Sequence, residues 1–433
     1  MVWLAWPGLF AWFTPDDLMN LHGVAFLHPG QILAGRERPT ANLVLKGLWE
    51  LFGLHPRPYR VFCFGLLLAN LWLALRLFFT SSLSWKTALF AGLFFSYHAQ
   101  LQDLYFNSGT IYDLLCFLFF FGAIVVYLRG LNDTAFSPGR TALTAALAAL
   151  AAGSKEIGVS LPLLLGLAAW TARAGRAAWR AAALAALVCW AVLAWTLWRA
   201  PMPANPAYQP DFRLTVLNAR WKLLTGDLLY RGPDWPAAAA WVVLAAAVLA
   251  ACRLRRRAAW LALGLIVVTP LPLMFLPQRS FYAFYIPYAG WCLLAGLLLD
   301  RLLTWAAPRS RLAPLVAAAA LAVFLVPQHR WLSAWIREHA YAPWERQVVA
   351  PGNVLRRQLP PLPPGSAIYF VDDPLPPPEQ EPHLLAFLCR LKSRDPQLAV
   401  WRARNPGQRT PEADWGRFAA VFRLTDTELV RIR

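Results

Sequence analysis

Two adjacent carboxylates, Asp16 and Asp17, follow the first apolar run of the chain, which extends from Val2 to Phe13. A charged group at a membrane boundary loses hydration, so ionisable residues there are candidates for function. A carboxylate in this place can act as a general base and take the proton of an acceptor hydroxyl as it attacks. Aspartate is also a favoured helix N-cap, so one carboxylate of the pair is equally expected to cap the helix that starts near Leu18.

A second polar group lies between a short and a long apolar run, in the segment 98–113. It contains Asp103, Asp113, a histidine, an asparagine and two tyrosines, whereas the flanking sequence is apolar. We expect Asp103 and Asp113 to bind substrate. The alternative is an ordinary polar loop in which Asp113 caps the following helix, and this alternative is stronger for Asp113 than for Asp103.

Two cationic positions complete the candidate site. The adjacent Lys155 and Glu156 are predicted to form an ion pair that divides a long apolar stretch. Such charges are costly unless they are partnered or useful, although a simple surface turn is the alternative. Arg279 precedes Tyr282 and Tyr285 at the end of another run, where tyrosine and arginine also serve as interface anchors. We expect Lys155 and the fork-shaped guanidinium of Arg279 to hold a phosphate, with Glu156 and both tyrosines also binding substrate.

The elements that must position these residues are predicted to be membrane helices. Of the 433 residues, 58% are hydrophobic and only 15% are charged, whereas a soluble domain has roughly 25% charged residues. An all-α polytopic membrane protein with about 11 transmembrane helices is expected, since one crossing needs roughly 20 apolar residues. The apolar runs lie at 1–14, 58–79, 86–97, 111–128, 141–153, 157–172, 178–199, 236–252, 258–277, 281–304 and 311–327.

The first of these runs is short for a membrane helix. Fourteen residues span about 21 Å as a helix, against roughly 30 Å for the hydrocarbon core. The run also lacks a basic leader, and no small-residue cleavage site precedes Asp16. We therefore expect either a late annotated start or a stunted first helix.

The charged loops predict an orientation. With the N-terminus inside, the inner loops carry most of the arginines, including the cluster Arg253 to Arg257, and the outer segments carry most of the acids. Lysine and arginine are enriched on the cytoplasmic side of membrane proteins. The net charge of +18 therefore needs no nucleic-acid partner. Membrane lipids are the expected partners of the arginine cluster.

The last hundred residues differ in character from the rest. We divide the chain into a transmembrane domain, 1–327, and a small C-terminal α/β domain, 328–433, expected outside the cytoplasm. Strands are predicted at 367–371, 418–422 and 428–432, and a helix at 384–391. The six cysteines show no disulfide framework or metal-ligand spacing, and there is neither a P-loop nor a Rossmann glycine fingerprint.

Several segments resemble the GT-C superfamily of polyprenyl-phosphate-sugar glycosyltransferases, and protein O-mannosyltransferases most of all. PDDLMNLH resembles the acidic first-loop motif, and RPTANL, from Arg38, resembles the approach to the second helix. HAQLQDLYFNSGTIYDLL, GSKEIGVSLP and RSFYAFYIPYAG resemble three further motifs. The sequence departs from the family at Asp103, where Glu is usual, at Thr110 and Ile111, where Arg is expected, and at Arg279, which lies a turn further from YIP.

The resemblance implies an inverting sugar transfer at the outer face of the cytoplasmic membrane. The donor would be a polyprenyl-phosphate-linked sugar and the acceptor a hydroxyl of a protein, a lipid or a glycan. Asp16 or Asp17 would be the base, and Lys155 and Arg279 would stabilise the leaving phosphate. No cofactor is implied, and a divalent metal is not indicated. Two other classes remain open, namely a transporter or flippase of a lipid-linked glycan and a non-catalytic membrane scaffold.

Overall fold

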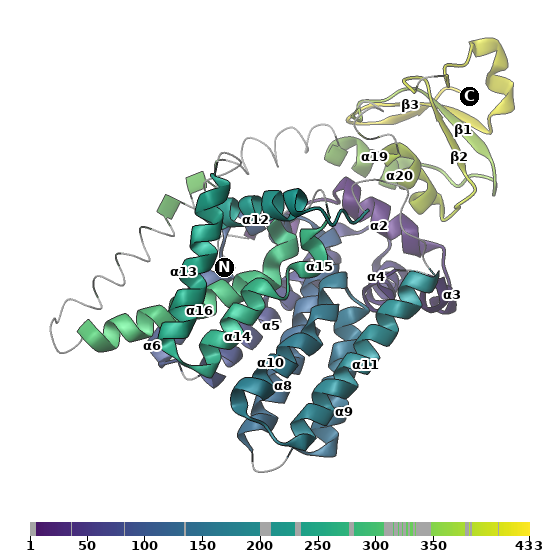
Figure 1. Ribbon diagram of the computed structural model, residues 1–433. Helices are drawn as coiled ribbons and strands as arrows, with labels where there is room; N and C mark the ends of the chain where they lie inside the picture. The colour runs from purple at the N-terminus through teal and green to yellow at the C-terminus, as the bar shows by residue number, and fades with distance from the viewer. Residues whose placement is uncertain are drawn as a thin grey trace.

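The computed structural model shows a helical bundle followed by a small α/β domain (Figure 1). The structure describes residues 6–35, 37–81, 83–133, 136–199, 209–229, 235–276, 281–306, 348–376, 381, 383–405 and 407–433, with scattered residues between 315 and 334. The predicted domain boundary at 328 and the predicted span 311–327 fall largely outside these residues. All six cysteines lie within them and are free thiols.

Within the described ranges, six helical segments are long and apolar enough to cross a membrane. This confirms the prediction of a chain built from apolar membrane-length helices, whereas eleven crossings stay a prediction. The six segments are α5 (Pro56–Thr80), η3 with α8 (Ser108–Asn132), α11 (Arg176–Arg199), α13 (Ala237–Leu254), α14 with α15 (Arg257–Met274) and η7 with α16 (Phe281–Trp305).

Shorter helices complete the bundle, and three of them coincide with predicted runs that are short. These are α6 (Trp85–Ser96), α9 (Pro138–Ala152) and η4 with α10 (Glu156–Ser160 and Leu161–Ala172). Other short elements join the long helices, namely α2 (Pro15–Ala25), α3 (Pro29–Gly35), α4 (Pro39–Phe52), η2 (Ala99–Leu101), α7 (Asp103–Phe106) and α12 (Leu214–Leu228).

The first apolar run differs from the predicted helix. Its described part holds only the five-residue 3-10 helix η1 (Trp6–Phe10), and the chain then stays non-helical as far as Thr14, which caps α2. The buried guanidinium of Arg60 donates to the carbonyls of Ala11 and Trp12. These carbonyls are thus satisfied by an arginine side chain instead of by helical hydrogen bonds.

The two ends of the helical bundle carry different charged residues. We name the end that carries α2 the α2 end. The helix α8 runs from Ile111 at this end to Asn132 at the opposite end, about 33 Å away for 22 residues. The opposite end gathers the last residues of α5, α8 and α10 and the first residues of α14 around one cavity. Arginines of the predicted inner loops, such as Arg256 and Arg257, lie there, away from the candidate carboxylates.

The C-terminal domain contains a four-stranded sheet in the order β2-β1-β3-β4. Strand β1 runs parallel to β2 and β3, and β4 is antiparallel to β3. Its elements are α19 (Ala350–Gln358), β1 (Ala367–Asp372), α20 (Leu384–Ser393), β2 (Ala399–Arg402), η10 (Glu412–Arg417), β3 (Ala420–Leu424) and β4 (Leu429–Arg431). The three predicted strands and the predicted helix are present, whereas β2 and α19 were not predicted.

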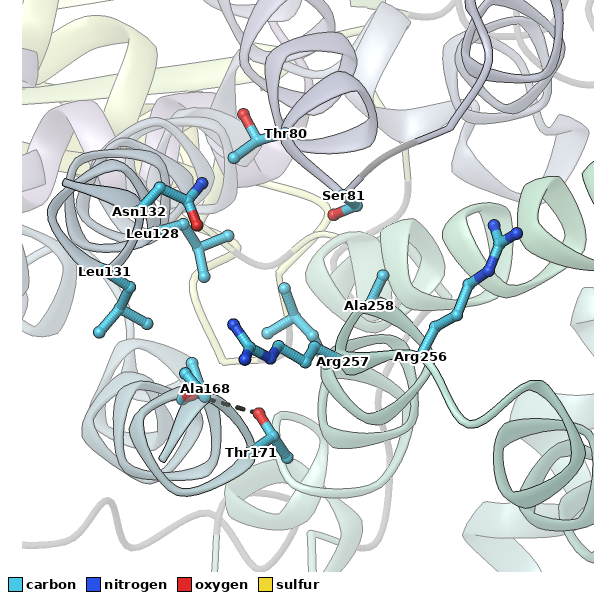
Figure 2. A pocket seen from close by; sticks show the side chains of 12 residues that line it. Thr80, Ser81, Leu128, Leu131, Asn132, Ala168, Thr171, Arg256, Arg257 and Ala258 are labelled. Carbon is cyan, nitrogen blue, oxygen red and sulfur yellow. Dashed lines mark hydrogen bonds between the residues drawn. The ribbon is translucent and has the colours of Figure 1, made fainter. Parts of the chain in front are cut away.

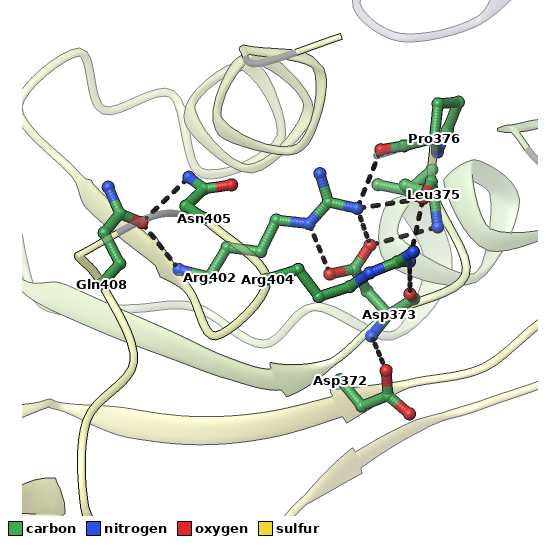
Figure 3. A network of polar contacts seen from close by, with 8 residues as sticks. All are labelled: Asp372, Asp373, Leu375, Pro376, Arg402, Arg404, Asn405 and Gln408. Carbon is green, nitrogen blue, oxygen red and sulfur yellow. Dashed lines mark hydrogen bonds and ion pairs between the residues drawn. The ribbon is translucent and has the colours of Figure 1, made fainter. Parts of the chain in front are cut away.

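A buried ion pair holds the segment that follows β1, residues 373–376, in place (Figure 3). Arg402 of β2 holds Asp373 through two guanidinium nitrogens and also donates to the carbonyls of Leu375 and Pro376, at 3.0 Å each. Arg404 donates to the Asp373 carbonyl at 2.8 Å. Because every one of these donors meets an acceptor in the same segment, the exit of β1 is fixed in one conformation.

The domain packs against the bundle at the α2 end (Figure 1). Helix α20 contacts α2, and the ring of Phe387 lies 4.5 Å from the ring of His22. The C-terminal domain therefore contacts one side of the helix that carries Asp16 and Asp17.

Candidate functional site

The structure separates the roles of the two adjacent aspartates. Asp17 is 3% exposed and lies at the third position of α2, where it completes a capping box with Thr14. Its carboxylate accepts from Thr14 N at 2.8 Å, from Arg60 Nη2 at 3.1 Å and from Gly109 N. Burial raises the pKa of Asp17, while Arg60 and these backbone donors oppose that rise. Asp16 is exposed, so it is the carboxylate of the pair that is available to a substrate.

A glycine makes the contact between Asp17 and the 98–113 segment possible. A Cβ on Gly109 would lie 2.9 Å from Asn107 Oδ1 and 3.0 Å from Asn20 Nδ2. These contacts are tighter than van der Waals distance, so a side chain there must displace its neighbours. Gly109 thereby lets the backbone approach Asp17 closely enough for its N–H to donate to the carboxylate.

We predict that Gly109→Ala lowers the free energy of unfolding by about 1–3 kcal/mol, because it displaces the N–H donor from buried Asp17. The measurement is the thermal unfolding of the purified protein. Gly47→Ala is the matched control, since Gly47 is an exposed residue inside α4 with open space around it. That control should be neutral or stabilising, by about 0.5–1 kcal/mol. Equal stability changes in the two variants would contradict the prediction.

Lys155 and Glu156 do not pair with one another as the sequence suggested. Lys155 Nζ donates to Asp113, and both residues are buried, at 8% and 5% exposed. Glu156 accepts instead from Arg38, whose Nε lies 2.9 Å from Glu156 Oε1. The Asp113 carboxylate therefore meets a lysine and does not cap α8, whose N-cap residue Thr110 makes no side-chain capping bond.

Arg38 takes part in this cluster in an unusual backbone conformation. It is the residue before α4 and has a φ of 55° and a ψ of 54°. Left-handed backbone is unfavourable for an arginine, and such strained residues concentrate at functional sites. The other non-glycine residues with positive φ among those described, Arg173, Arg255 and Arg394, end helices, where this conformation is common.

Tyr282 lies near charged residues of both signs. Lys155 Nζ is 5.4 Å from the centre of its ring. The same tyrosine is within electrostatic range of Asp16, Asp103, Asp113 and Arg38. The structure thus brings together residues from four separate stretches of the sequence, namely Asp16, Asp103 with Asp113, Lys155 with Glu156, and Tyr282. We name this group, with Arg38, the acid–cation cluster.

Asp103 is a titratable neighbour of Asp16. Burial raises the pKa of Asp103 to about 6, and the negative charge of Asp16 contributes to the rise. A carboxyl group with a raised pKa in the folded state binds more protons when folded than when unfolded in the interval between about pH 4 and pH 6. The folded state therefore loses stability as the pH rises through this interval.

We predict that Asp103→Asn removes part of this loss of stability. A rise of about two pKa units corresponds to at most about 3 kcal/mol, and partial exposure lowers that figure. Thermal unfolding of both proteins at pH 4 and pH 7 measures the difference. The stability of the wild-type protein should fall more between these pH values than that of the variant. Parallel pH profiles would contradict the prediction.

Besides Asp17, which pairs with Arg60, two predicted residues are not part of the acid–cation cluster as described. Tyr285 lies in the core, where its ring packs 4.9 Å from Phe95 and 4.6 Å from Phe117. Its expected contact with substrate is therefore not supported by its position. Arg279 lies outside the described residues, so its phosphate-binding role stays a prediction.

Sequence reasoning missed three charged residues in or near the acid–cation cluster. Arg38 and Arg60 pair with Glu156 and Asp17, and half-buried Glu381 of the C-terminal segment is within electrostatic range of Asp16. The sequence could have indicated that Arg60 is paired, because an arginine inside an apolar run needs a partner. Glu381 carried no such signal, since its proximity to Asp16 depends on the packing of α20 on α2.

A cavity of about 370 Å³ lies at the opposite end of the bundle (Figure 2). Arg257 points into it, whereas Arg256 turns away and meets Asp300 at 3.2 Å. Among the described residues, the lining otherwise consists of apolar, hydroxyl and amide side chains without a carboxylate. It thereby differs from the acid–cation cluster, which combines carboxylates with cations.

Among the residues that the structure describes, there is no group of three or more His, Cys, Asp or Glu side chains that could hold a metal ion. No protein-family model matches the chain, and no curated protein or solved structure does so either. The resemblance to the GT-C superfamily therefore stays a prediction that these comparisons do not test.

Proposed function

We propose that the chain is a membrane glycosyltransferase that moves a sugar from a polyprenyl-phosphate donor to an acceptor hydroxyl. The observation that carries this proposal is the grouping of exposed Asp16 with Asp103, Tyr282 and the cations Lys155 and Arg38 in one cluster. A transfer of this kind needs a base for the acceptor and cations for the departing phosphate, and both lie at the end of apolar helices.

In the proposed reaction, Asp16 takes the proton of the acceptor hydroxyl. The acceptor oxygen forms a bond to the anomeric carbon while the bond from that carbon to the phosphate oxygen breaks, which inverts the anomeric configuration. The bonding electrons leave with the polyprenyl phosphate. Its new negative charge is stabilised by cationic donors at the site.

The cations retain donors for this task. Lys155 has three N–H donors and gives one to Asp113, and Arg38 has five and gives two to Glu156. Asp113 and Glu156 then act as positioning residues, which hold the two cations in place. We keep Arg279 as a third proposed phosphate ligand from the sequence resemblance.

The proposal places the acid–cation cluster and the C-terminal domain on the outer side of the cytoplasmic membrane. The predicted inner loops support this orientation, since the arginines Arg256 and Arg257 of one such loop lie at the opposite end of the bundle. A protein, a lipid or a glycan is equally suitable as acceptor. Because the charge of Asp16 acts on half-buried Glu381, we include the C-terminal domain in the proposed acceptor side.

The test is the release of polyprenyl phosphate by the purified full chain in detergent. A panel of synthetic polyprenyl-phosphate sugars serves as donor, and an envelope extract supplies acceptors. We expect release with at least one sugar, together with a new glycosylated product in the mass spectrum. Intact donor throughout the panel, with unchanged envelope glycans and glycoproteins after loss of the gene, would contradict the proposal.

A further inference from the structure

Two neighbouring cavities lie where the C-terminal domain meets the turn between α4 and α5. Their volumes are about 660 Å³ and about 510 Å³. They share Leu51, Phe52, His55, Arg356 and Arg357 in their linings. We name the two together the basic pocket.

The charge of the basic pocket is strongly unbalanced. The larger cavity is lined by Arg57, Arg356 and Arg357 with His55, and the described residues of its lining include no carboxylate. The smaller cavity adds Lys392 and Arg394, and the carboxylate of Glu50 there is paired with Lys46. Like charges held this close repel one another, so an anion bound among them would be stabilised.

The guanidinium of Arg356 has more hydrogen-bond donors than acceptors around it. One terminal nitrogen lies 2.9 Å from His55 Nδ1, but its Nε is buried without a hydrogen-bond partner. Burial and the charge of Arg357 lower the pKa of Arg356. A buried donor without an acceptor is rare in folded proteins and indicates that an acceptor is missing. A phosphate oxygen is the acceptor that a guanidinium fits best.

The position of the basic pocket indicates what kind of molecule carries the anion. Pro56 in its lining is the first residue of α5, a helix long enough to cross a membrane, so the pocket lies at headgroup depth. Phe10 and Leu51 in its lining are 51% and 75% exposed. Arg57 lies 5.6 Å from the ring centre of Phe10. Aromatic and basic side chains combined at this depth are typical of the membrane interface.

We propose that the basic pocket binds the phosphate of an anionic phospholipid, with its acyl chains beside the exposed apolar residues. The proposal rests on the membrane placement of α5 proposed above but not on sugar transfer. Basic pockets at helix ends attract anionic headgroups by about 1 kcal/mol for each lysine or arginine. Removing Arg356 and Arg357 together should therefore weaken binding about 30-fold.

The test uses the purified full chain in detergent, titrated with phosphatidylglycerol or phosphatidylcholine. Native mass spectrometry counts the lipid molecules retained. We expect a clear preference for phosphatidylglycerol in the wild-type protein and its loss in R356Q/R357Q. Arg423→Gln is the matched control, because it removes one arginine from an exposed position of β3 in the same domain. This control should retain the preference.

Equal retention of both lipids by the wild-type protein, or an unchanged preference in R356Q/R357Q, would overturn the proposal. A separate titration with inorganic phosphate identifies the source of the anion. Tight binding of free phosphate without any preference between the lipids would also overturn the lipid assignment. If R356Q/R357Q unfolds, Arg57→Gln replaces it, since Arg57 is exposed, and about fivefold weaker binding is then expected. None of these measurements needs transferase activity.

Discussion

Asp16→Asn should lower the rate of sugar transfer about 100- to 10,000-fold, the usual effect of losing a general base. The exposed carboxylate of Asp16 should contribute little to folding, so the thermal stability of the variant should match that of the wild-type protein. The measurement is transfer from the active polyprenyl-phosphate sugar in detergent, with unfolding followed in parallel.

Asp17→Asn is the matched comparison, because it changes the neighbouring residue in the same way. It should destabilise the fold by about 3–5 kcal/mol, since the charge of Arg60 would remain buried without its anion. Its activity should fall together with its stability. Full activity of Asp16→Asn, of Asp17→Asn and of the double variant would contradict a role for either carboxylate in transfer.

Lys155→Met should be the most destabilising single change in the acid–cation cluster. The Asp113 carboxylate is 5% exposed and would lose its only cationic hydrogen-bond donor among the described residues. Breaking a buried ion pair from one side costs about 3–5 kcal/mol, whereas replacing both partners by apolar residues is often neutral. The double variant Lys155→Met/Asp113→Leu should therefore regain most of the lost stability.

Activity of that double variant separates two roles of Lys155. If the ammonium group holds the donor phosphate, the double variant should fold well but turn over slowly, with weakened donor binding. Normal donor kinetics in a stable double variant would assign Lys155 to folding alone. Arg140→Met is the control, since the Arg140–Asp133 pair is exposed and should contribute less than about 1 kcal/mol.

The sequence predicted those features that depend on neighbouring residues. Apolar runs predicted α5, α8, α11, α13 and α16, because the length and composition of a membrane helix are local properties. Alternating and continuous apolar residues likewise predicted β1, β3 and β4. Strand β2 escaped prediction because it is only four residues long and three of them are half-buried.

Local sequence patterns could not predict which charged residues form ion pairs with one another. Arg38 and Glu156 are 118 positions apart, and Arg60 and Asp17 are 43 apart, so their contacts depend on how helices pack. Adjacent Lys155 and Glu156 suggested a local pair, but each has a partner from a distant segment of the chain. The hydrogen bonds in the described part of the first apolar run are likewise non-local, since Arg60 of α5 donates to the carbonyls of Ala11 and Trp12.

The packing of α20 on α2 links two parts of the chain that differ greatly in composition. One is the helix that carries Asp16, and the other is a small domain whose sheet takes no part in the bundle. Changes in the surface of that domain can alter the surroundings of Asp16 without touching the membrane helices. Mutations in the C-terminal domain can therefore vary what approaches Asp16 while the sequences of the apolar helices stay unchanged.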